Sequence, residues 1–485
     1  MMSGHLPRML LLLLAAAALV SGSMLYAIRA IDEAPPRTLG YRIEQRIMPR
    51  DGPLADIGYA VARFIADADR IDQAEWQAAS HSRQRPLAGI GAAVDDGKPA
   101  AQPAGRELLV STPLQAEQAF EMAQPGDVIT FLPGEYRFER TLGPSRGGSA
   151  QRPIVVQARK QGTVKLLFAT AEAILVEEPY WTFRNLHLQG VCASQDQCEH
   201  GFHVAGRARN FVATDNTLLD FNAHFKVNGL ENHYPDHGII RRNTIRNTSA
   251  RRTAGSVNLV DIVAASGWLV SENLIADFVK TGGNKVSFGV YMKGAGSRNR
   301  IERNLVICHD RLQPAGQEVG LSLGGGGTGP AYCRDRRCIT EQENSVIESN
   351  LVLACSDVGI YLNRAAASRV THNTLLDTAG IDLRFAETAA NVQGNLVDGI
   401  IRTRDGALLD TDDNISTPLS RLYAGSHPVR ALFGDVASLD LGWSGMPART
   451  PAAPGMPDLC GQPRPLLAAY GAFEDFSACK GMRSP

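Results

Sequence analysis

Three features are scarce in this sequence. Aromatic residues make up only 6% of the chain, and the formal net charge is −1, from 49 basic and 50 acidic residues. This charge balance argues against a general nucleic-acid binder, which would carry a basic excess. Proline is scarce in one region only: of 26 prolines, just Pro235, Pro314 and Pro330 lie within residues 181–415. Because proline cannot donate a strand hydrogen bond, this region is typical of strands whose N–H groups are all in use.

Other residue types are plentiful and unevenly placed. The chain has 485 residues, of which 44% are hydrophobic and 20% charged, so it is an ordinary globular sequence with room for two or three domains. It contains 47 glycines, and all 20 asparagines fall between Asn185 and Asn414. One region is therefore built on a different plan from its flanks.

The chain opens with a predominantly apolar run, Met9–Ile28, between Arg8 and Arg29. This length is sufficient to span a bilayer as a helix, so residues 1–29 are predicted to be an uncleaved signal anchor in the bacterial membrane. A cleaved signal peptide ending near Ser21–Ser23 and a buried soluble helix are the alternatives. Under the first two interpretations the protein is exported: it is held in the inner membrane facing the periplasm, or secreted if the signal is cleaved.

The eight cysteines form an even set, as expected of disulfides in an exported chain. Their spacing predicts three local bridges: Cys192–Cys198, Cys333–Cys338 and Cys460–Cys479. A metal site at Cys192, Cys198, His200 and His203 is the alternative for the first pair, but its spacing matches no standard zinc motif.

The segments on either side of the asparagine-rich region differ from it in composition. Residues 30–105 are rich in proline and alanine and are predicted to form a stalk with one helix near Leu54–Ala66. Residues 106–415 are predicted to be the main domain, and residues 416–485 a C-terminal extension that packs on it.

An internal repeat runs through the main domain. An apolar residue usually stands three positions before an asparagine, which Leu or Thr follows, as in IRRNTI, VSENLI, IERNLV and VTHNTL. The repeated asparagines are Asn185, Asn216, Asn243, Asn273, Asn304, Asn350, Asn373 and Asn395. Their intervals vary, which excludes helical-hairpin repeats and indicates short strands joined by turns of free length. Stacked asparagines can bond one another along a ladder.

Each unit also holds a second strand of the form apolar-x-apolar, such as FKV at Phe225, VYM at Val290 and IYL at Ile360. The outer residues of each triplet would enter the core and the middle one would point outward. The predicted fold is an all-β, right-handed parallel β-helix. Cys308 and Cys355 follow the repeated asparagine by similar steps in consecutive coils, so they are predicted to form the fourth disulfide.

Two segments carry a resemblance to a known superfamily. GDVITFLPGEYRF (Gly126–Phe138) is similar to the opening strands of the chondroitinase B and alginate lyase family, within the pectate-lyase-like β-helices. Gly461, Arg464 and Gly471–Glu474 resemble a tail found in bacterial β-helix proteins. This resemblance is specific for the fold, and much weaker for activity.

The same family implies a lysine base on one coil, an arginine on the next and a calcium held by Asn and Glu side chains. Lys293 resembles that lysine, although its spacing to the coil asparagine differs, and Gly324 and Gly325 stand where the family has Arg and His. Calcium is thus a cofactor that the resemblance allows and the sequence does not specify.

The outward residues of the second strand predict the site. The middle column contains His203, Lys226, Asp261, Tyr291, Ser322, Tyr361 and Asp382, and Asn228, Lys293, Gly324, Asn363 and Arg384 follow it, with Arg364 beside Asn363. Cations and aromatic rings on one face suit an acidic polysaccharide, although a plain solvated sheet face would also be polar. The candidate catalytic residues are Lys293 or Lys226 as base, Arg384 (or Arg364, or calcium) as neutraliser and Tyr291 as acid. The candidate substrate-binding residues are His203, Asp261, Tyr361, Asn363 and Arg364.

These residues favour a polysaccharide lyase or epimerase that acts on an acidic polysaccharide. A non-catalytic carbohydrate-binding or envelope structural protein is the alternative. A glycoside hydrolase is disfavoured, because Asp261 and Asp382, the only acids of the outward column, would lie about four coils apart.

Overall fold

The computed structural model describes residues 34–47, 52–80, 83, 87, 89–92, 105–325, 328–410, 413–453 and 455–480. The chain divides into a small unit, which comprises residues up to Arg70 together with Pro418–Ser426, and a large unit, which comprises Ile71–Thr417 and His427–Pro485. Across the described ranges, no helix is both long and apolar enough to cross a membrane. The apolar run Met9–Ile28 lies outside those ranges, so the signal anchor stays a prediction.

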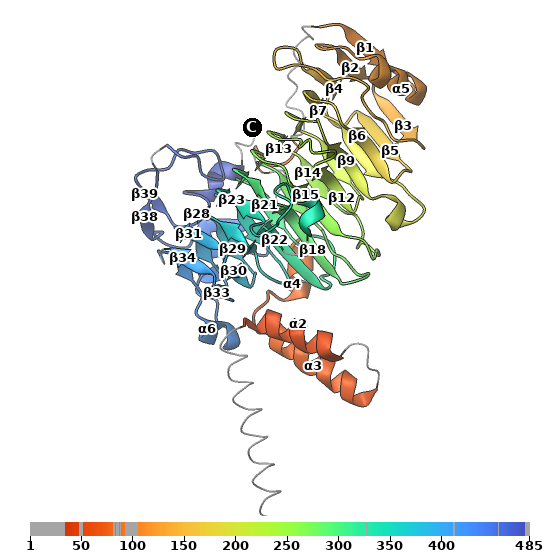
Figure 1. Cartoon of the computed structure of the whole chain (residues 1–485). Coiled ribbons are helices and arrows are strands. Elements are labelled where there is room, and N and C mark those ends of the chain that lie inside the picture. Colours follow the sequence, from red (N-terminus) through yellow and green to blue (C-terminus); the bar gives the residue numbers. More distant parts are fainter. Residues whose placement is uncertain are drawn as a thin grey trace, which may run out of the picture. The chain divides into compact units, whose positions relative to one another are not determined.

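The large unit is built from three long parallel sheets that stack coil upon coil (Figure 1). The first sheet contains, in spatial order, β1 (Glu107–Val110), β2 (Val128–Phe131), β4 (Ile154–Ala158), β7 (Trp181–Arg184), β10 (Val212–Thr214), β13 (Ile239–Arg241), β16 (Leu269–Ser271), β20 (Arg300–Glu302), β24 (Val346–Glu348), β28 (Ser368–Thr371), β31 (Ala389–Gln393) and β34 (Leu408–Asp410). The second contains β3 (Gly134–Phe138), β5 (Val164–Phe168), β8 (His187–Gly190), β11 (Thr217–Leu219), β14 (Thr244–Arg246), β17 (Leu274–Ala276), β21 (Leu305–Ile307), β25 (Leu351–Leu353), β29 (Thr374–Leu376), β32 (Leu396–Val397) and β35 (Ile415–Ser416).

The third sheet carries the candidate site. It contains β6 (Glu172–Val176), β9 (His200–Ala205), β12 (Ala223–Asn228), β15 (Val257–Val263), β18 (Val286–Lys293), β22 (Gln317–Leu323), β26 (Ile360–Asn363), β30 (Gly380–Arg384) and β33 (Ile400–Arg404). A short fourth parallel sheet joins β19 (Gly296–Ser297), β23 (Gln342–Glu343) and β27 (Ala365–Ala366). The all-β right-handed parallel β-helix predicted from the repeat is confirmed.

A buried asparagine ladder occupies the turn between the first and second sheets. Asn273 shows its pattern: its side-chain amide donates to Asn304 Oδ1 at 3.0 Å, and its own Oδ1 accepts from the side-chain amide of Asn243 at 3.1 Å. The same side-chain bond links each consecutive pair of asparagines, at Asn216, Asn243, Asn273, Asn304, Asn350, Asn373, Asn395 and Asn414. The predicted ladder is therefore confirmed, and Asn414 extends it by one coil.

The prediction was wrong at Asn185. In its coil the ladder position is held by Leu186, whose backbone N–H donates to Asn216 Oδ1 at 3.0 Å. The residue before a ladder asparagine adopts a left-handed conformation, as at Glu272 (φ 56°), and Asn185 (φ 60°) holds that preceding position. Asparagine tolerates this conformation better than most side chains, so Asn185 shapes the turn instead of forming the ladder.

Apolar side chains fill the interior of the coils. Phe183, Phe202, Phe211 and Phe225 are fully buried, and the rings of Phe202 and Phe225 stack at 5.3 Å between centroids. Helix α5 (Pro113–Met122) lies at the N-terminal end of this core, where Phe120 stacks on Trp181 at 5.5 Å.

The C-terminal extension packs on the second sheet. Its hairpins are β36 (Phe433–Asp435) with β37 (Asp440–Trp443) and β38 (Arg449–Pro451) with β39 (Leu467–Ala469), and it has short helical turns at Arg430–Leu432 and Phe476–Lys480. Two further helical turns, Gln195–Gln197 and Pro330–Tyr332, belong to loops of the β-helix. Phe473 and Leu441 join Leu305, Leu351 and Leu376 in a second buried cluster. Helix α4 (Gln73–Ala79) adds Trp76, whose indole N–H donates to His309 O at 2.9 Å.

The small unit is helical where a stalk with a single helix was predicted. Helices α2 (Pro36–Ile47) and α3 (Pro53–Asp67) pack together, and the unit also contains α6 (Leu419–Tyr423). Arg37 and Asp69 form a buried ion pair at 3.0 Å that connects the start of α2 to the end of α3.

All eight cysteines are paired as predicted. The bridges are Cys192–Cys198, Cys308–Cys355, Cys333–Cys338 and Cys460–Cys479. Cys192 and Cys198 are therefore not ligands of a zinc ion.

Candidate active site

The third sheet places the predicted column in register. His203, Lys226, Asp261, Tyr291, Ser322, Tyr361 and Asp382 are successive strand partners, and Arg402 continues the column. Successive side chains of a strand point to opposite faces of the sheet, so a shift of one residue in the strand register would have turned this column toward the core.

Three side chains of this column and its edge form an ionic cluster. Lys226 Nζ lies 2.6 Å from Asp261 Oδ2, and Lys293 Nζ lies 3.5 Å from Asp261 Oδ1. The side chains of Asp261, Lys293 and Lys226 are exposed by only 4%, 16% and 23%. Lys293 Nζ also sits 4.0 Å from the centre of the Tyr291 ring, which stacks on Phe288 at 4.2 Å.

Burial and mutual charge perturb this cluster. Burial lowers the pKa of Lys293 below its usual range and Lys226 acts in the same direction, while Asp261 opposes both. Burial alone would raise the pKa of Asp261, but Lys226 and Lys293 outweigh it and hold that pKa below its usual range. The lowered pKa makes Lys293 easier to deprotonate than an ordinary exposed lysine.

Two cavities flank the cluster and share both lysines. One, of about 490 Å³, lies beyond the C-terminal ends of the strands and is lined by Lys226, Lys293, Asn228, Tyr332 and Arg336 among others. The other, of about 300 Å³, lies at the N-terminal ends of β9, β12 and β15 and is lined by His200, Asn222, Asn258, Lys226 and Lys293 among others. Both cavities reach the two lysines, and we refer to the face of the sheet that carries the lysines and the two cavities as the groove.

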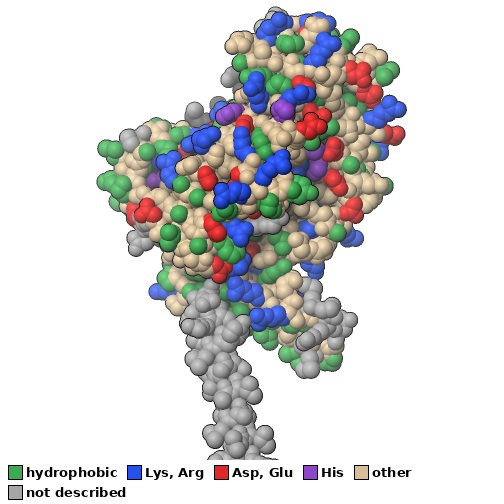
Figure 2. Space-filling view, in the orientation of Figure 1, with side chains coloured by type: hydrophobic (Ala, Val, Ile, Leu, Met, Phe, Trp, Pro, Cys, Tyr) green, Lys and Arg blue, Asp and Glu red, His purple; other side chains and the backbone are tan. Residues whose placement is uncertain are grey.

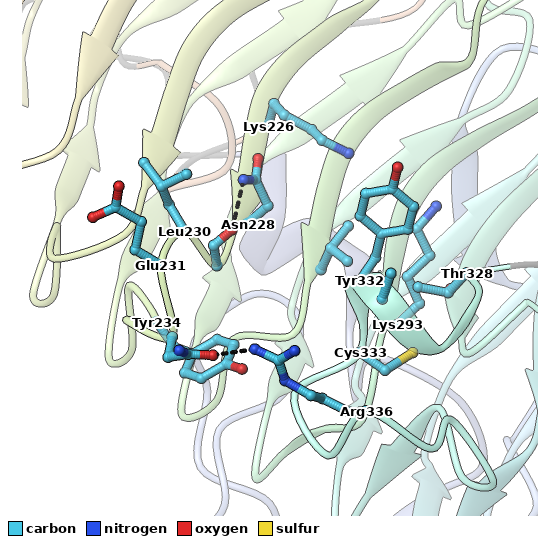
Figure 3. Close-up of a pocket in the computed structure, with 14 residues that line it drawn as sticks. Lys226, Asn228, Leu230, Glu231, Tyr234, Lys293, Thr328, Tyr332, Cys333 and Arg336 are labelled. Carbon is cyan, nitrogen blue, oxygen red and sulfur yellow. Dashed lines mark hydrogen bonds between the residues drawn. The ribbon is translucent and has the colours of Figure 1, made fainter.

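A disulfide-closed loop forms one wall of the larger cavity. Residues 328–338 carry Thr328, Tyr332 and Arg336, and Arg336 hydrogen-bonds Asn232 on the opposite loop (Figure 3). Arg334 anchors the loop by a 2.7 Å ion pair with Asp236. The Cys333–Cys338 pair was readable from sequence, but its position beside Lys293 was not, because the loop follows the neighbouring strand β22.

Gly325 packs closely against Tyr291, because a Cβ on Gly325 would lie 1.9 Å from the Tyr291 hydroxyl. The backbone therefore lies directly on Tyr291, which is only 6% exposed and lines neither cavity. Burial, together with Asp261 and Glu341, raises the pKa of Tyr291 above its usual range. Tyr291 lies beneath Lys293, away from the position expected of a proton donor to a ligand.

Gly324 excludes the arginine that the chondroitinase B family implies. Gly324 follows Leu323, the partner of Met292, and so occupies the coil position next to Lys293. Its φ is +71°, and a Cβ there would lie 1.9 Å from Asn363 O. The backbone of this coil cannot accommodate a side chain at that position.

The acid nearest the lysines does not fit a calcium ion. Both oxygens of Asp261 face ammonium groups, at 2.6 and 3.5 Å, so cations already occupy the positions that a calcium would need. The acids at the end of the ladder also have hydrogen-bond partners within the protein. Asp413 accepts hydrogen bonds from the hydroxyls of Thr450 and Tyr470, and Asp410 accepts one from the side-chain amide of Asn391.

The remaining candidates lie in a separate cluster. The side-chain amide of Asn363 donates to the Tyr361 hydroxyl at 2.8 Å, and Arg384 pairs with Asp405 at 2.5 Å while stacking with Arg364 on Phe385. Arg384 is three coils from Lys293 in the same column, about 14 Å at the usual strand spacing. The structure therefore does not bring the predicted neutraliser Arg384 to the predicted base.

His203 lies at the opposite end of the column. Its Nδ1 is 2.7 Å from Glu172 Oε1, and His200 Nδ1 is 3.4 Å from the same oxygen. Hydrogen bonds to His200 and His203 hold the pKa of Glu172 below its usual range. Sequence reasoning missed Glu172, because β6 lacks the asparagine signature of the later coils.

Charges of both signs alternate on the surface of the large unit. Figure 2 shows Lys and Arg side chains interspersed with Asp and Glu on the face it presents. The cationic character of the site is therefore local: Lys226, Lys293 and Arg336 outnumber Glu231 around the larger cavity.

Comparison with solved structures agrees with this architecture. The pectate lyase Pel9A superposes with a TM-score of 0.54 at 12% identity, covering 79% of this chain and all of that one. The chain has the pectate-lyase-like β-helix fold. A PL6 family polysaccharide lyase from Pseudopedobacter saltans (TM-score 0.40, 12% identity, 70% of this chain and 99% of that one) and a rhamnogalacturonan lyase (0.42, 11%, 64% and 87%) are less similar to this β-helix. No protein-family model and no curated protein matches the sequence of the β-helix.

Proposed function

We propose that this β-helix protein binds an acidic polysaccharide in the groove over β12, β15 and β18 and cleaves it by β-elimination, with Lys293 as the base. One observation carries the proposal. Lys293 is a largely buried lysine between two cavities, its pKa is lowered by burial, and a second cation, Lys226, lies within the same ionic cluster. A lysine that lines a cavity and has a pKa perturbed by burial and by a neighbouring charge is a candidate for a functional site.

The groups present suit the steps of the reaction. The uronate carboxylate pairs with Lys226 and Arg336, which makes the proton on the adjacent carbon more acidic. The neutral amine of Lys293 removes that proton, and the C–H electrons form a C=C bond while the C–O bond to the next sugar breaks. We assign protonation of the leaving oxygen to Tyr332, an exposed phenol that lines the same cavity.

The fold supports this choice of chemistry only in general terms. The superposed protein with the same fold is described as a pectate lyase, and pectate is an acidic polysaccharide. A shared fold does not determine activity, so the proposal depends on the lysine cluster.

A non-catalytic carbohydrate-binding protein is the second candidate. It is favoured by Gly324, which removes the expected arginine, and by Asp261, whose charge opposes the loss of the Lys293 proton. A Lys293 that keeps its proton would bind uronates without cleaving them.

The test compares Lys293→Ala with wild type on pectate, alginate and glycosaminoglycans. Cleavage is followed by the ultraviolet absorbance of the unsaturated product, and affinity by calorimetry. Catalysis predicts at least a hundredfold loss of turnover. Thermal unfolding is measured in parallel, because Lys293 also pairs with the buried Asp261 and its loss lowers stability as well. Binding without catalysis predicts no turnover by the wild type and an affinity loss of about 1 kcal/mol.

Lys165→Ala is the matched control, because Lys165 is an exposed lysine on β5 in the second sheet. It should change neither quantity. If Lys293→Ala retains full turnover on a polysaccharide that the wild type cleaves, Lys293 is not the base.

A further inference from the structure

Glu172, His200 and His203 form a compact cluster at the start of the third sheet. Each offers one ligand atom, and these atoms all lie within 4.8 Å of one another. Glu172 begins β6 and His200 begins β9, which are adjacent parallel strands paired at these two residues. The side chains of Glu172, His200 and His203 are exposed by 29%, 20% and 18%, so the cluster is reachable from solvent and partly enclosed.

Asn228 determines the protonation of His203. The side-chain amide nitrogen of Asn228 donates to Gly229 O at 3.1 Å, which directs its Oδ1 toward His203 Nε2 at 2.7 Å. An amide oxygen only accepts, so Nε2 of His203 carries the proton.

The other ring nitrogen then faces a second acceptor. In the neutral ring Nδ1 is a bare lone pair, yet it lies 2.7 Å from the Glu172 carboxylate oxygen. Two acceptors at this distance repel each other unless a positive charge lies between them. His203 therefore requires either a second proton or a cation at Nδ1.

We propose that this cluster is a binding site for a transition-metal ion of the zinc type, held by Glu172, His200 and His203. Two imidazoles and one carboxylate are a donor set that zinc accepts in proteins, with an open position for water or a ligand. The bond from His203 Nε2 to Asn228 Oδ1 is the outer contact that orients a metal-bound histidine.

One separation between ligand atoms suits this ion as it stands, and a second needs a small side-chain movement. Bonds of about 2.0–2.1 Å place the ligand atoms of a tetrahedral zinc roughly 3.3–3.5 Å apart. His200 Nδ1 and Glu172 Oε1 are already 3.4 Å apart, and the contact between His203 and Glu172 opens by rotation of the partly exposed carboxylate. Calcium prefers six or more oxygens and is disfavoured by the imidazoles.

The cluster lies beside the proposed catalytic groove and is separate from its lysines. His200 lines the smaller cavity together with Lys226 and Lys293, and His203 is the strand partner of Lys226. All eight cysteines are in disulfides, so thiols do not compete for the metal. The site is defined by metal binding alone and does not depend on the proposed reaction.

The test is zinc binding by the full, oxidised, untagged chain after removal of metal with a chelator. Calorimetry with zinc chloride at pH 7.5 should give one site with a micromolar or tighter Kd, and cobalt(II) should give the visible absorption of a tetrahedral centre. His200→Ala and Glu172→Gln should each weaken binding at least tenfold, whereas His233→Ala, at an exposed loop histidine, should not.

Thermal unfolding completes the test, since zinc bound only by the folded state should raise the Tm of wild type and of His233→Ala. Glu172→Gln keeps the shape of the side chain, so the zinc affinity of this variant can be interpreted even if His200→Ala folds poorly. Failure of the wild type to bind zinc, or equal affinity in Glu172→Gln, would overturn the proposal. A proton shared between His203 and Glu172 would then account for their 2.7 Å contact. Neither result would alter the Lys293 test.

Discussion

Replacing Asn273 by leucine tests the ladder that organises the β-helix. Asn273 is fully buried and makes four side-chain bonds. Its Oδ1 accepts from the backbone N–H of Asn243 at 2.8 Å and from the Asn243 side chain at 3.1 Å, and its amide donates to Ile240 O at 2.9 Å and to Asn304 Oδ1 at 3.0 Å.

The magnitude follows from these bonds. Four hydrogen bonds at about 1 kcal/mol each would be lost, and the Asn243 N–H, left without a partner, adds to the cost. The leucine returns about 1–2 kcal/mol through added apolar burial. We therefore expect Asn273→Leu to lower the free energy of unfolding by about 3–6 kcal/mol.

Urea unfolding of the oxidised protein, followed by circular dichroism, measures this change. Asn391→Leu is the control, because Asn391 is partly exposed on β31 and its amide makes a single 3.2 Å bond to Asp410, so its effect should stay within about 0.5 kcal/mol. A free energy for Asn273→Leu within 0.5 kcal/mol of wild type, at an unchanged m-value, would refute the structural role of the ladder.

Two further predictions concern the binding of protons. If Lys293 is the base, kcat/KM should rise with pH through a pKa below 10.5, because burial lowers the pKa of Lys293 and only its neutral amine accepts a proton. Asp261→Asn should shift this rise in kcat/KM to lower pH, and an unshifted profile would contradict the ion pair between Asp261 and Lys293. Burial, reinforced by the charge of Arg251, lowers the pKa of His224 to about 3. Below pH 6.5 the unfolded chain therefore binds a proton at His224 that the folded chain does not bind, and the free energy of unfolding should fall by up to about 1.4 kcal/mol per pH unit between pH 6.5 and about 3. Urea unfolding at several pH values measures this slope, which His224→Phe should flatten.

The repeat made the fold readable in advance. A ladder asparagine, an aliphatic pair and an apolar-x-apolar strand recur because each coil must satisfy the same buried turn and the same core. The register of the outward column followed from that pattern, including Asp261 next to Tyr291. Asn185 was misplaced because asparagine serves two roles at this turn, as a ladder member and as a left-handed residue before it.

The site was only partly readable. Lys226, Asp261 and Lys293 were found because strand periodicity assigns them to one face. The ion pairs of Asp261 with the two lysines could not be predicted, because the sequence does not show which side chains reach across to a neighbouring strand. Arg384 was grouped with them although three coils separate it from Lys293.

The sequence by itself determined the β-helix, its disulfide pairs and the outward column, since these depend on local periodicity that repeats from coil to coil. Only the tertiary structure decided which members of that column touch: Asp261 between two lysines, Glu172 beside two histidines, and Tyr291 covered by Gly325. These contacts join residues from loops and coils of unequal length, and a side chain's reach and burial depend on all of them together.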